Sequence, residues 1–466
     1  MFKFKARSWM IAASAAALAT LAILPVVQAQ DATETPVPIV ATEAADSANI
    51  TGTLTSMGVS STGDEIQTTR LNYFTQSYPN VTLQFSEGGF DAQQFLTAVA
   101  SGNPPDLVHM DSQILGTYAA SGQLMPLTDC IKDIDWSQYR PVVADQMKLG
   151  GVVYGIPEFF NSLQLIINTK AVSDAGLTLD DISTTDWSKI SDLNTKMTVG
   201  KGNSLTRMGF DSKLPEFLPL WAKANGADLL SADGKTAQLN DPKVVEALQF
   251  AVSIYDAQGG FAAMKAFRDT WDFFGANNQV VADQIGFWPM EQWYMSFLAG
   301  TSPDAPVAFK AFTDKQGNPL TYVTSSAYAI PVGSKNPQAA CAFAKTVTSV
   351  GAWVAAAQAR ADIRAAKGTP NTGVYTGNAK ADAAIFPAIV KPGDSKVFND
   401  AVNMTLDLQN HGFAMPANPA GAEFQQAWQD AVNRVLNGEQ TPQQALDQAQ
   451  TEAQAALDAA WSKKSS

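Results

Sequence analysis

The clearest alternation of apolar and polar positions lies in residues 155–170, GIPEFFNSLQLIINTK. Apolar side chains at every second position after residue 161 predict a largely buried strand. Pro157 has no backbone donor, so we expect the preceding regular element to end there. Between this break and the strand, residues 158–161 offer a carboxylate, two aromatic faces and an amide. This mixture suits a polar ligand at a crossing between two packed bodies; the alternative is a connector whose two phenylalanines are core.

Strand and helix patterns alternate along the chain before this stretch. Strands are predicted at 52–57, at 81–85 and from residue 106, with helices at 64–74 and 91–100. Such alternation predicts a mostly parallel sheet covered on both faces, with ligands bound beyond the carboxyl ends of its strands. The residues at such an end are His109, Met110, Asp111 and Gln113. Asp111 equally suits the N-cap of the following helix.

Three later helices are predicted from an N-cap residue followed by proline. The pairs are Asp241-Pro242, Asn336-Pro337 and Thr441-Pro442, and Thr441 with Gln444 makes a capping box. Apolar residues share one face in the first and last of these helices, which indicates packing rather than partner binding.

Two further strand patterns end at a proline. Residues 284–289 end at Pro289 inside an aromatic-dense region, and residues 321–332 contain Pro331 near their end. Together with Pro157 they predict three crossings between two lobes, the arrangement of a hinge-bending protein. The first lobe is expected to comprise residues 50–157 and 288–333, and the second residues 158–287 and 334–466.

The N-terminal segment has the pattern of an export signal. Residues 1–29 combine three early positive charges, an apolar run and a small-residue cleavage site, which predicts a signal peptide; an uncleaved anchor is the alternative. No cysteine follows, so we expect no lipid anchor on an N-terminal cysteine. Residues 30–49 are rich in Ala, Thr, Pro and Glu and predict a disordered tether. The protein is therefore expected in the periplasm or at the extracellular cell surface.

The net charge and the few cysteines and histidines exclude several classes of function. A net charge of −13 over 466 residues makes nucleic acid an unsuitable partner. Cys130 and Cys341 fall in different expected lobes, where a bridge would hinder lobe motion, so unpaired thiols are favoured over a disulfide. The two histidines, His109 and His411, form no metal-binding spacing, and we expect no metal, no cofactor and no histidine-based catalytic triad.

Five stretches, in this order along the chain, resemble one known family. They are residues 74–81 (FTQSYPNV), 98–127 (AVASGNPPDLVHMDSQILGTYAASGQLMPL), 153–177 (VYGIPEFFNSLQLIINTKAVSDAGL), 329–348 (AIPVGSKNPQAACAFAKTVT) and 435–446 (VLNGEQTPQQAL). Through them, residues 50–460 resemble extracellular solute-binding proteins of ATP-binding-cassette importers, in the carbohydrate-binding branch that includes maltodextrin-binding proteins. The resemblance implies a two-lobed α/β periplasmic-binding-protein clamp. Each lobe would be a mostly parallel sheet flanked by helices.

In such proteins aromatic rings stack on sugars, while carboxylates and amides bond the hydroxyls. By position, the resemblance implies ligand contacts from Ser60, Met110, Asp111, Gln113, Glu158, Phe159, Asn161, Trp221, Trp288, Glu291, Ser325 and Ser326. Trp288 is predicted to face the cleft, and Trp293, within a predicted helix, to be core. Glu291 suits a solvated helix start equally well. Residues 149–151, 167–170 and Met110 depart from the usual motif, so the particular ligand does not transfer.

The leading hypothesis is a non-enzymatic, monomeric receptor that binds a sugar or oligosaccharide and delivers it to the permease subunits of an importer. One alternative keeps the fold and changes the solute to a polyamine, a polyol, glycerol phosphate, iron or a small anion. The least favoured alternative is a carbohydrate-active enzyme with two catalytic carboxylates.

Overall fold

The computed structural model describes residues 49–464. The predicted signal peptide, and the predicted tether apart from residue 49, lie outside the described residues. Within residues 49–464, no single helix is long and apolar enough to cross a membrane. Helices α11 (Pro337–Val347) and α12 (Val350–Lys367) reach that length and apolarity only as a pair, which is bent by 52°.

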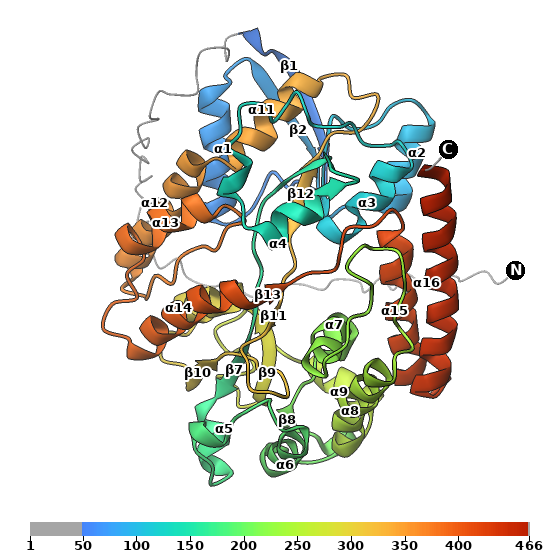
Figure 1. Cartoon of the computed structure of the whole chain (residues 1–466). Coiled ribbons are helices and arrows are strands. Elements are labelled where there is room, and N and C mark those ends of the chain that lie inside the picture. The colour runs from blue at the N-terminus through green and yellow to red at the C-terminus, as the bar shows by residue number, and fades with distance from the viewer. Residues whose placement is uncertain (1–48, 465–466) are drawn as a thin grey trace, which may run out of the picture. The chain divides into compact units, whose positions relative to one another are not determined.

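The first sheet contains five strands in the order β2-β1-β3-β12-β6. Figure 1 labels its strands β1, β2 and β12. The bounds are β1 Gly52–Met57, β2 Val81–Ser86, β3 Leu107–Asp111, β6 Gly155–Pro157 and β12 Ser326–Ala329. Consecutive side chains of β3 point to opposite faces of the sheet. Leu107 and Val108 accordingly belong to two separate apolar clusters. We define the first lobe as this sheet with α1 (Glu65–Ser77), α2 (Ala92–Ala100), α3 (Ser112–Ala120), α4 (Pro141–Ala144), α11 and the ribbon of β4 (Lys148–Leu149) and β5 (Val152–Val153).

The second sheet has the order β10-β7-β9-β8. The bounds are β7 Leu163–Asn168, β8 Met208–Phe210, β9 Ile285–Glu291 and β10 Val307–Lys310. All six residues of β7 are buried, which confirms the strand predicted there. We define the second lobe as this sheet with α5 (Thr169–Asp174), α6 (Trp187–Met197), α7 (Leu214–Ala224), α8 (Pro242–Gln258), α9 (Phe261–Arg268), α10 (Trp293–Thr301) and α14 (Lys396–Leu408).

The remaining elements are not assigned to either lobe. They are α12, α13 (Ala379–Ala388), α15 (Gly421–Leu436), α16 (Pro442–Lys464) and the strand pair β11 (Thr321–Tyr322) and β13 (Gly412–Phe413). Helices α15 and α16 run side by side, and α15 contacts both α3 and α7 (Figure 1). The N-cap predictions at Asp241 and Thr441 are confirmed: Asp241 accepts from Lys243 N, and Thr441 and Gln444 bond reciprocally.

Both sheets are mixed, which corrects the prediction of mostly parallel sheets. In the first sheet, β2, β1 and β3 are parallel, whereas β12 is antiparallel to β3 and to β6. In the second sheet β7 is antiparallel to β10 and β9, and only β8 and β9 run parallel. The physical reason is connectivity: β12 enters the first sheet after crossing from the second lobe, and therefore arrives in the opposite direction to β3.

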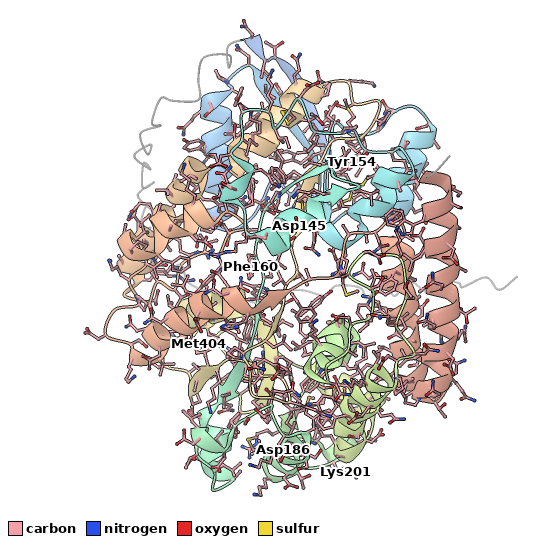
Figure 2. All side chains as sticks on the ribbon, in the orientation of Figure 1. Asp145, Tyr154, Phe160, Asp186, Lys201 and Met404 are labelled. Atoms are coloured by element: carbon pink, nitrogen blue, oxygen red, sulfur yellow. A yellow bond between two sulfur atoms is a disulfide. The ribbon has the colours of Figure 1, made fainter. Side chains whose placement is uncertain are left out.

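The chain crosses between the lobes in three adjacent segments. Residues 158–162 link β6 to β7, and residues 323–325 lead from β11 into β12. A third segment, residues 371–378, follows α12 and precedes α14, which packs on β10. Isolated bridges join these segments, Asn161 to Thr324 and Phe159 to Thr376. Figure 2 shows Phe160, which is fully buried, in this crossing region.

The crossing predicted at residues 287–289 is wrong. Strand β9 stays in the second sheet, where Pro289 pairs with Leu165 of β7. Strand β8 pairs with β9 only as far as Phe287. Beyond that residue β9 has a free edge on the β8 side, so a proline without an N–H is tolerated there without ending the strand.

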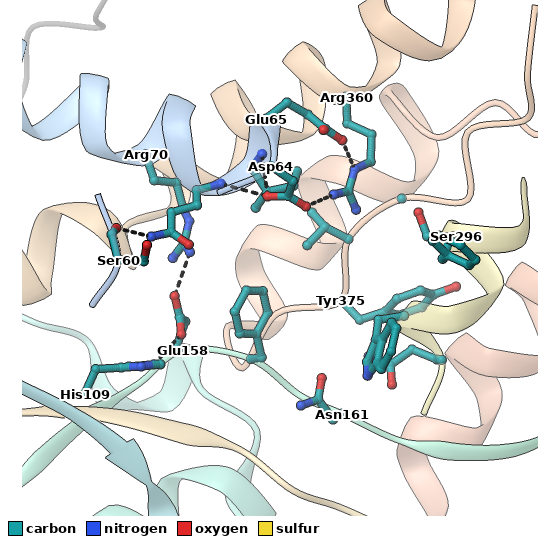
Figure 3. Close-up of a pocket in the computed structure, with 18 of the residues that line it drawn as sticks. Ser60, Asp64, Glu65, Arg70, His109, Glu158, Asn161, Ser296, Arg360 and Tyr375 are labelled. Atoms are coloured by element: carbon teal, nitrogen blue, oxygen red, sulfur yellow. Dashed lines mark hydrogen bonds and ion pairs between the residues drawn. The ribbon is translucent and has the colours of Figure 1, made fainter. Parts of the chain in front are cut away.

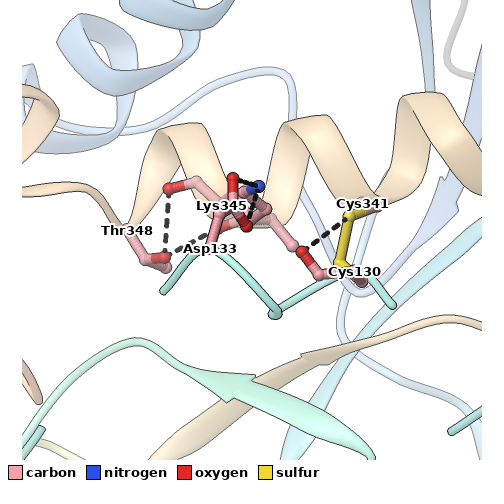
Figure 4. Close-up of a disulfide and its surroundings, with 6 residues drawn as sticks. Cys130, Asp133, Cys341, Lys345 and Thr348 are labelled. Carbon is pink, nitrogen blue, oxygen red and sulfur yellow. Dashed lines mark hydrogen bonds and ion pairs between the residues drawn. A yellow bond between two sulfur atoms is a disulfide. The ribbon is translucent and has the colours of Figure 1, made fainter. Parts of the chain in front are cut away.

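Consequently two segments belong to other lobes than expected. Strand β10, within residues 288–333, lies in the second sheet, and α11, within residues 334–466, packs on α1 and β1 of the first lobe. The expectation of unpaired thiols is also wrong, because Cys130 and Cys341 form a disulfide (Figure 4). Both cysteines pack against the same apolar cluster of the first lobe, so the bond does not restrain movement between lobes.

Candidate functional site

A cavity of about 690 Å³ lies at the crossing segments, between residues of both lobes. The first lobe contributes the turn after β1 and the start of α1, and the second contributes the start of α10 and Phe274. Helix α12 and residues 373–375 complete the wall. Figure 3 shows this cavity with Asn161 and Glu158, both from the first crossing segment.

Glu158 is the centre of a buried ion cluster at one side of this cavity. Its Oε1 accepts from Arg70 Nη2 at 2.6 Å and from the Tyr328 hydroxyl at 2.8 Å. Its Oε2 lies 2.6 Å from His109 Nε2 and accepts from the Ser326 hydroxyl at 3.0 Å. Burial alone raises the pKa of Glu158, but Arg70 and His109 outweigh burial and lower it well below its usual range. Both carboxylate oxygens are therefore occupied by protein donors.

Arg70 is itself held from several directions. Its side chain is 4% exposed, donates to the Val347 carbonyl and lies 4.1 Å from the Trp353 ring centroid. Phe159 packs edge-on against the same tryptophan, with the ring centroids 5.3 Å apart. The crossing at residues 158–159 is therefore fixed to α1 and α12 by charge and by aromatic packing.

A second ion cluster connects α12 to the start of α1. Arg360 Nη2 lies 2.5 Å from Asp64 Oδ2, and its Nε lies 2.5 Å from Glu65 Oε1 (Figure 3). The other oxygen of Asp64 caps α1 by accepting from Ile66 N and Gln67 N. Burial acts to raise the pKa of Glu65, but Arg360 lowers it overall. One helical turn after Arg360, Arg364 Nη2 donates to the Ser296 carbonyl of α10 at 3.0 Å.

The second lobe supplies an aromatic wall. Phe274 is 69% exposed and Trp293 is 36% exposed, and both line the cavity. Their rings stack with an interplanar angle of 19° and a centroid distance of 6.1 Å. Two neighbouring aromatic faces that remain open to solvent form a platform on which a flat apolar surface can pack. Among residues 49–464, no group of three or more His, Cys, Asp or Glu side chains is arranged to hold a metal ion.

A second hollow of about 420 Å³ shares part of its wall with the cavity. Gly58, His109 and Asn161 line both. Asp111 lines the second hollow and caps α3 by accepting from Gln113 N at 2.9 Å, which confirms the N-cap prediction. Its contact with a ligand stays a prediction. Burial raises the pKa of Asp111.

The structure brings most of the predicted site residues together. Ser60, Glu158, Phe159 and Asn161 line the cavity, and Met110, Asp111, Ser325 and Ser326 line the second hollow. The predicted residues that line neither are Gln113, Trp221, Trp288 and Glu291. Burial raises the pKa of Glu291, at the end of β9. For the predicted residues that line the cavity or the second hollow, contact with a ligand stays a prediction.

The three tryptophan predictions are wrong. Trp221 is fully buried among Trp187, Phe210 and Phe312, and its indole N–H donates to Ser212 O. Trp288 is 2% exposed, because β9 lies inside a sheet that is covered on both faces. Trp293 was predicted to be core, yet it begins α10 on the side that faces the cavity.

Sequence reasoning did not select Arg70, Arg360 or Arg364 as site residues. The available signal was two arginines one turn apart in an alanine-rich segment, AAAQARADIRAAK, because small side chains on a helix let a neighbouring helix approach. Their positions at the cavity depend on how α12 packs against α1 and α10, which the local pattern does not contain.

The family of the chain follows from comparison with known proteins. Residues 58–352 match the bacterial extracellular solute-binding protein family. The chain belongs to this family. Membership of an extracellular family implies that the protein is exported. A maltotriose-binding protein from Pyrococcus abyssi is 25% identical over 104 residues, a match that spans 22% of this chain and 23% of that protein.

Solved structures confirm the two-lobed periplasmic-binding-protein fold. The protein CpMnBP1 with mannobiose bound has a TM-score of 0.68 and 24% identity, covering 87% of this chain and 99% of that one. A solute-binding protein from Thermotoga lettingae, bound with α-D-tagatose, has a TM-score of 0.67 and 21% identity, covering 88% and 100%. The maltodextrin-binding domain MalE from Bdellovibrio bacteriovorus, bound to maltotriose, has a TM-score of 0.65 and 20% identity, covering 87% and 99%.

Proposed function

We propose that this solute-binding protein takes up a carbohydrate in the cavity at the crossing segments and delivers it to the permease of an ATP-binding-cassette importer, without catalysing a reaction. The observation that carries the proposal is the exposed aromatic pair Phe274 and Trp293 in a wall that also contains the amide of Asn161. The apolar C–H face of a sugar packs on aromatic rings, while its hydroxyls need polar partners.

The bound sugars of the structural relatives support this assignment. Mannobiose, α-D-tagatose and maltotriose occupy three proteins with the same fold. The ion pairs of the cavity favour a sugar over a polyamine, because the three carboxylates in its wall, Asp64, Glu65 and Glu158, are already paired with arginines. A polycation would have to compete with those arginines.

Delivery would depend on lobe movement. A ligand that contacts both lobes stabilises the closed arrangement by its differential contacts, and closure changes the surface offered to the permease. The three crossing segments, which bridges at Asn161 and Phe159 join, form a compact hinge for this movement. We propose that the protein acts as a monomer in the periplasm or at the cell surface, without an N-terminal lipid anchor.

The test is calorimetric titration of the purified protein with a panel of monosaccharides, disaccharides and trisaccharides. At least one sugar should bind with saturable heat, and Trp293→Leu should weaken its affinity by roughly three- to tenfold through loss of the stacking face. Trp461→Leu is the matched control, since Trp461 lies on α16 outside the cavity and should leave the affinity unchanged.

Silence across the whole panel, with binding of spermidine or another non-sugar solute instead, contradicts the carbohydrate assignment. Release of new reducing ends from an oligosaccharide during incubation contradicts the absence of catalysis. Equal affinities of Trp293→Leu and Trp461→Leu for the same sugar would move the binding site away from the aromatic pair.

A further inference from the structure

The carboxylates in the cavity wall have little accepting capacity left. Both oxygens of Glu158 are occupied by four protein groups, and Asp64 uses one oxygen on Arg360 and the other on the backbone of α1. Glu65 also pairs with Arg360. Neutral sugars are commonly bound through free carboxylates that accept from hydroxyls, and this wall offers few of them.

Arg364 differs from the other charged groups of the wall. Within residues 49–464, no carboxylate lies within 4.0 Å of its guanidinium, whereas Arg70 and Arg360 each have at least one such partner. In the described part of the chain, its guanidinium makes one hydrogen bond, from Nη2 to the Ser296 carbonyl. A guanidinium carries five N–H donors, so most of its donating capacity is unused.

The position of Arg364 is fixed by the packing of α12 on α10. A Cβ at Gly300 would lie 1.3 Å from Arg364 Nη1, so the missing side chain of this glycine provides the space that the guanidinium occupies. Ser296 and Gly300 are one turn apart on α10, and Trp293 precedes Ser296 by three positions. The guanidinium therefore lies against the helix face that also carries Trp293 of the aromatic platform.

Among the described residues, the charges around Arg364 act on it at a distance and not through an ion pair. Burial, followed by the neighbouring charge of Arg360, lowers the pKa of Arg364 from its usual value, and arginine nevertheless stays protonated. Glu65 and Asp64 act on it only at longer range. A partly buried cation that lacks a counterion is stabilised when an anion arrives from outside.

We propose that the carbohydrate carries an anionic oxygen group, a carboxylate or a phosphate, and that Arg364 binds this group while the sugar ring packs on Trp293. The proposal rests on the proposed function and specifies its substrate class. Arginine suits the task because its planar fork matches the paired oxygens of carboxylate and phosphate. Hydrogen bonds to charged groups contribute about 1.5–3 kcal/mol, which corresponds to roughly 10- to 150-fold in affinity.

The experiment compares matched sugars on the full exported chain by calorimetry. The pairs are galactose with galacturonate and with galactose 6-phosphate, and α-1,4-galactotriose with trigalacturonate. An acidic sugar should bind at least about tenfold more tightly than its neutral counterpart, and the preference should decrease as salt is raised. The phosphate and carboxylate arms identify which anion is preferred.

Variants assign the preference to one residue. Arg364→Gln should lower the affinity for the acidic sugar to that for its neutral counterpart. Lys367→Gln removes the same charge from an exposed position on the same helix and should keep the preference. Arg364→Lys retains charge without the fork and should keep part of it, which also provides a reading if the glutamine variant fails to fold.

The outcomes of these titrations distinguish the anionic substrate, the role of Arg364 and the carbohydrate function. Equal or tighter binding of neutral sugars by the wild type refutes the anionic substrate and leaves the carbohydrate function standing. An acidic preference that Arg364→Gln keeps refutes the role of Arg364. Failure of every sugar, neutral and acidic, overturns the proposed function and this inference together.

Discussion

Replacement of Glu158 by glutamine should strongly destabilise the first lobe. The carboxylate is 3% exposed and receives Arg70 and His109 at 2.6 Å, together with the hydroxyls of Tyr328 and Ser326. Glutamine keeps the shape of the side chain but supplies only one accepting oxygen, and its amide N–H groups point at donors. Arg70 would then be a buried cation without a counter-charge.

The expected loss can be estimated from this geometry. Removing one partner of a buried ion pair costs about 3–5 kcal/mol, because the remaining charge stays desolvated. An exposed pair of the same lobe provides the comparison: Asp133, 60% exposed, pairs with Lys345. Asp133→Asn should cost less than about 1 kcal/mol, since water replaces the lost partner.

The assay is urea unfolding at pH 7, followed by circular dichroism, on wild type, Glu158→Gln and Asp133→Asn. A double variant, Arg70→Met with Glu158→Gln, should lose less than the sum of the two single losses, because it removes both buried charges together. The reasoning is refuted if Glu158→Gln lies within about 1 kcal/mol of Asp133→Asn, or if the two single effects add within about 0.5 kcal/mol.

The stabilisation that Glu158 provides should depend on pH. The pKa of Glu158 is lowered in the folded protein, so its contribution to stability is present above its unfolded pKa of about 4.3 and is lost as the pH falls towards the folded value. The difference in unfolding free energy between wild type and Glu158→Gln should therefore be constant near neutral pH and decrease below about pH 4. A difference that grows on acidification would contradict the assigned direction.

Two further predictions concern packing and covalent structure. Cys130→Ser should lower the free energy of unfolding by about 2–5 kcal/mol, because the lost disulfide closes a loop with a sequence separation of 211. Thiol titration of unfolded, unreduced wild type should find no free thiol. Two reactive thiols per chain would contradict the bond. Gly116→Ala should cost about 1–3 kcal/mol, because the new Cβ would lie 2.1 Å from the backbone oxygen of Asn418 next to α15. Gly89→Ala, with no heavy atom within 4 Å of the new Cβ, is the matched control, and equal stability of the two variants would show that Asn418 does not approach α3 this closely.

Local patterns predicted the elements around the crossing well. The period of two after Pro157 corresponds to the fully buried strand β7, and the Asp241 and Thr441 caps start helices where expected. These features depend on residues that are close in sequence. A strand depends on its alternating side chains, and a helix start depends on a cap for its first backbone N–H groups. The first crossing at residues 158–162 follows from the same local reasoning.

The candidate site was only partly predictable. Asn161 and Phe159 line the cavity as expected, since they lie in the connection between two sheets. Trp288 was expected in the cleft and is buried, whereas Trp293 was expected in the core and lines the cavity. Both lie in the same aromatic-rich stretch of sequence. They differ in that Trp288 belongs to a buried strand and Trp293 to the exposed start of a helix. That difference is a property of the neighbouring layers.

By itself, the sequence determined the α/β elements, the first crossing and the family to which the chain is similar, because each depends on short-range periodicity, caps or motif order. Only the tertiary structure decided that β9 remains in the second sheet and that Cys130 meets Cys341 within one lobe. It also decided that Arg364 faces the cavity without a carboxylate partner among residues 49–464. The physical reason is common to the three: each depends on which distant segments pack together, and burial and ion pairing are set by those neighbours.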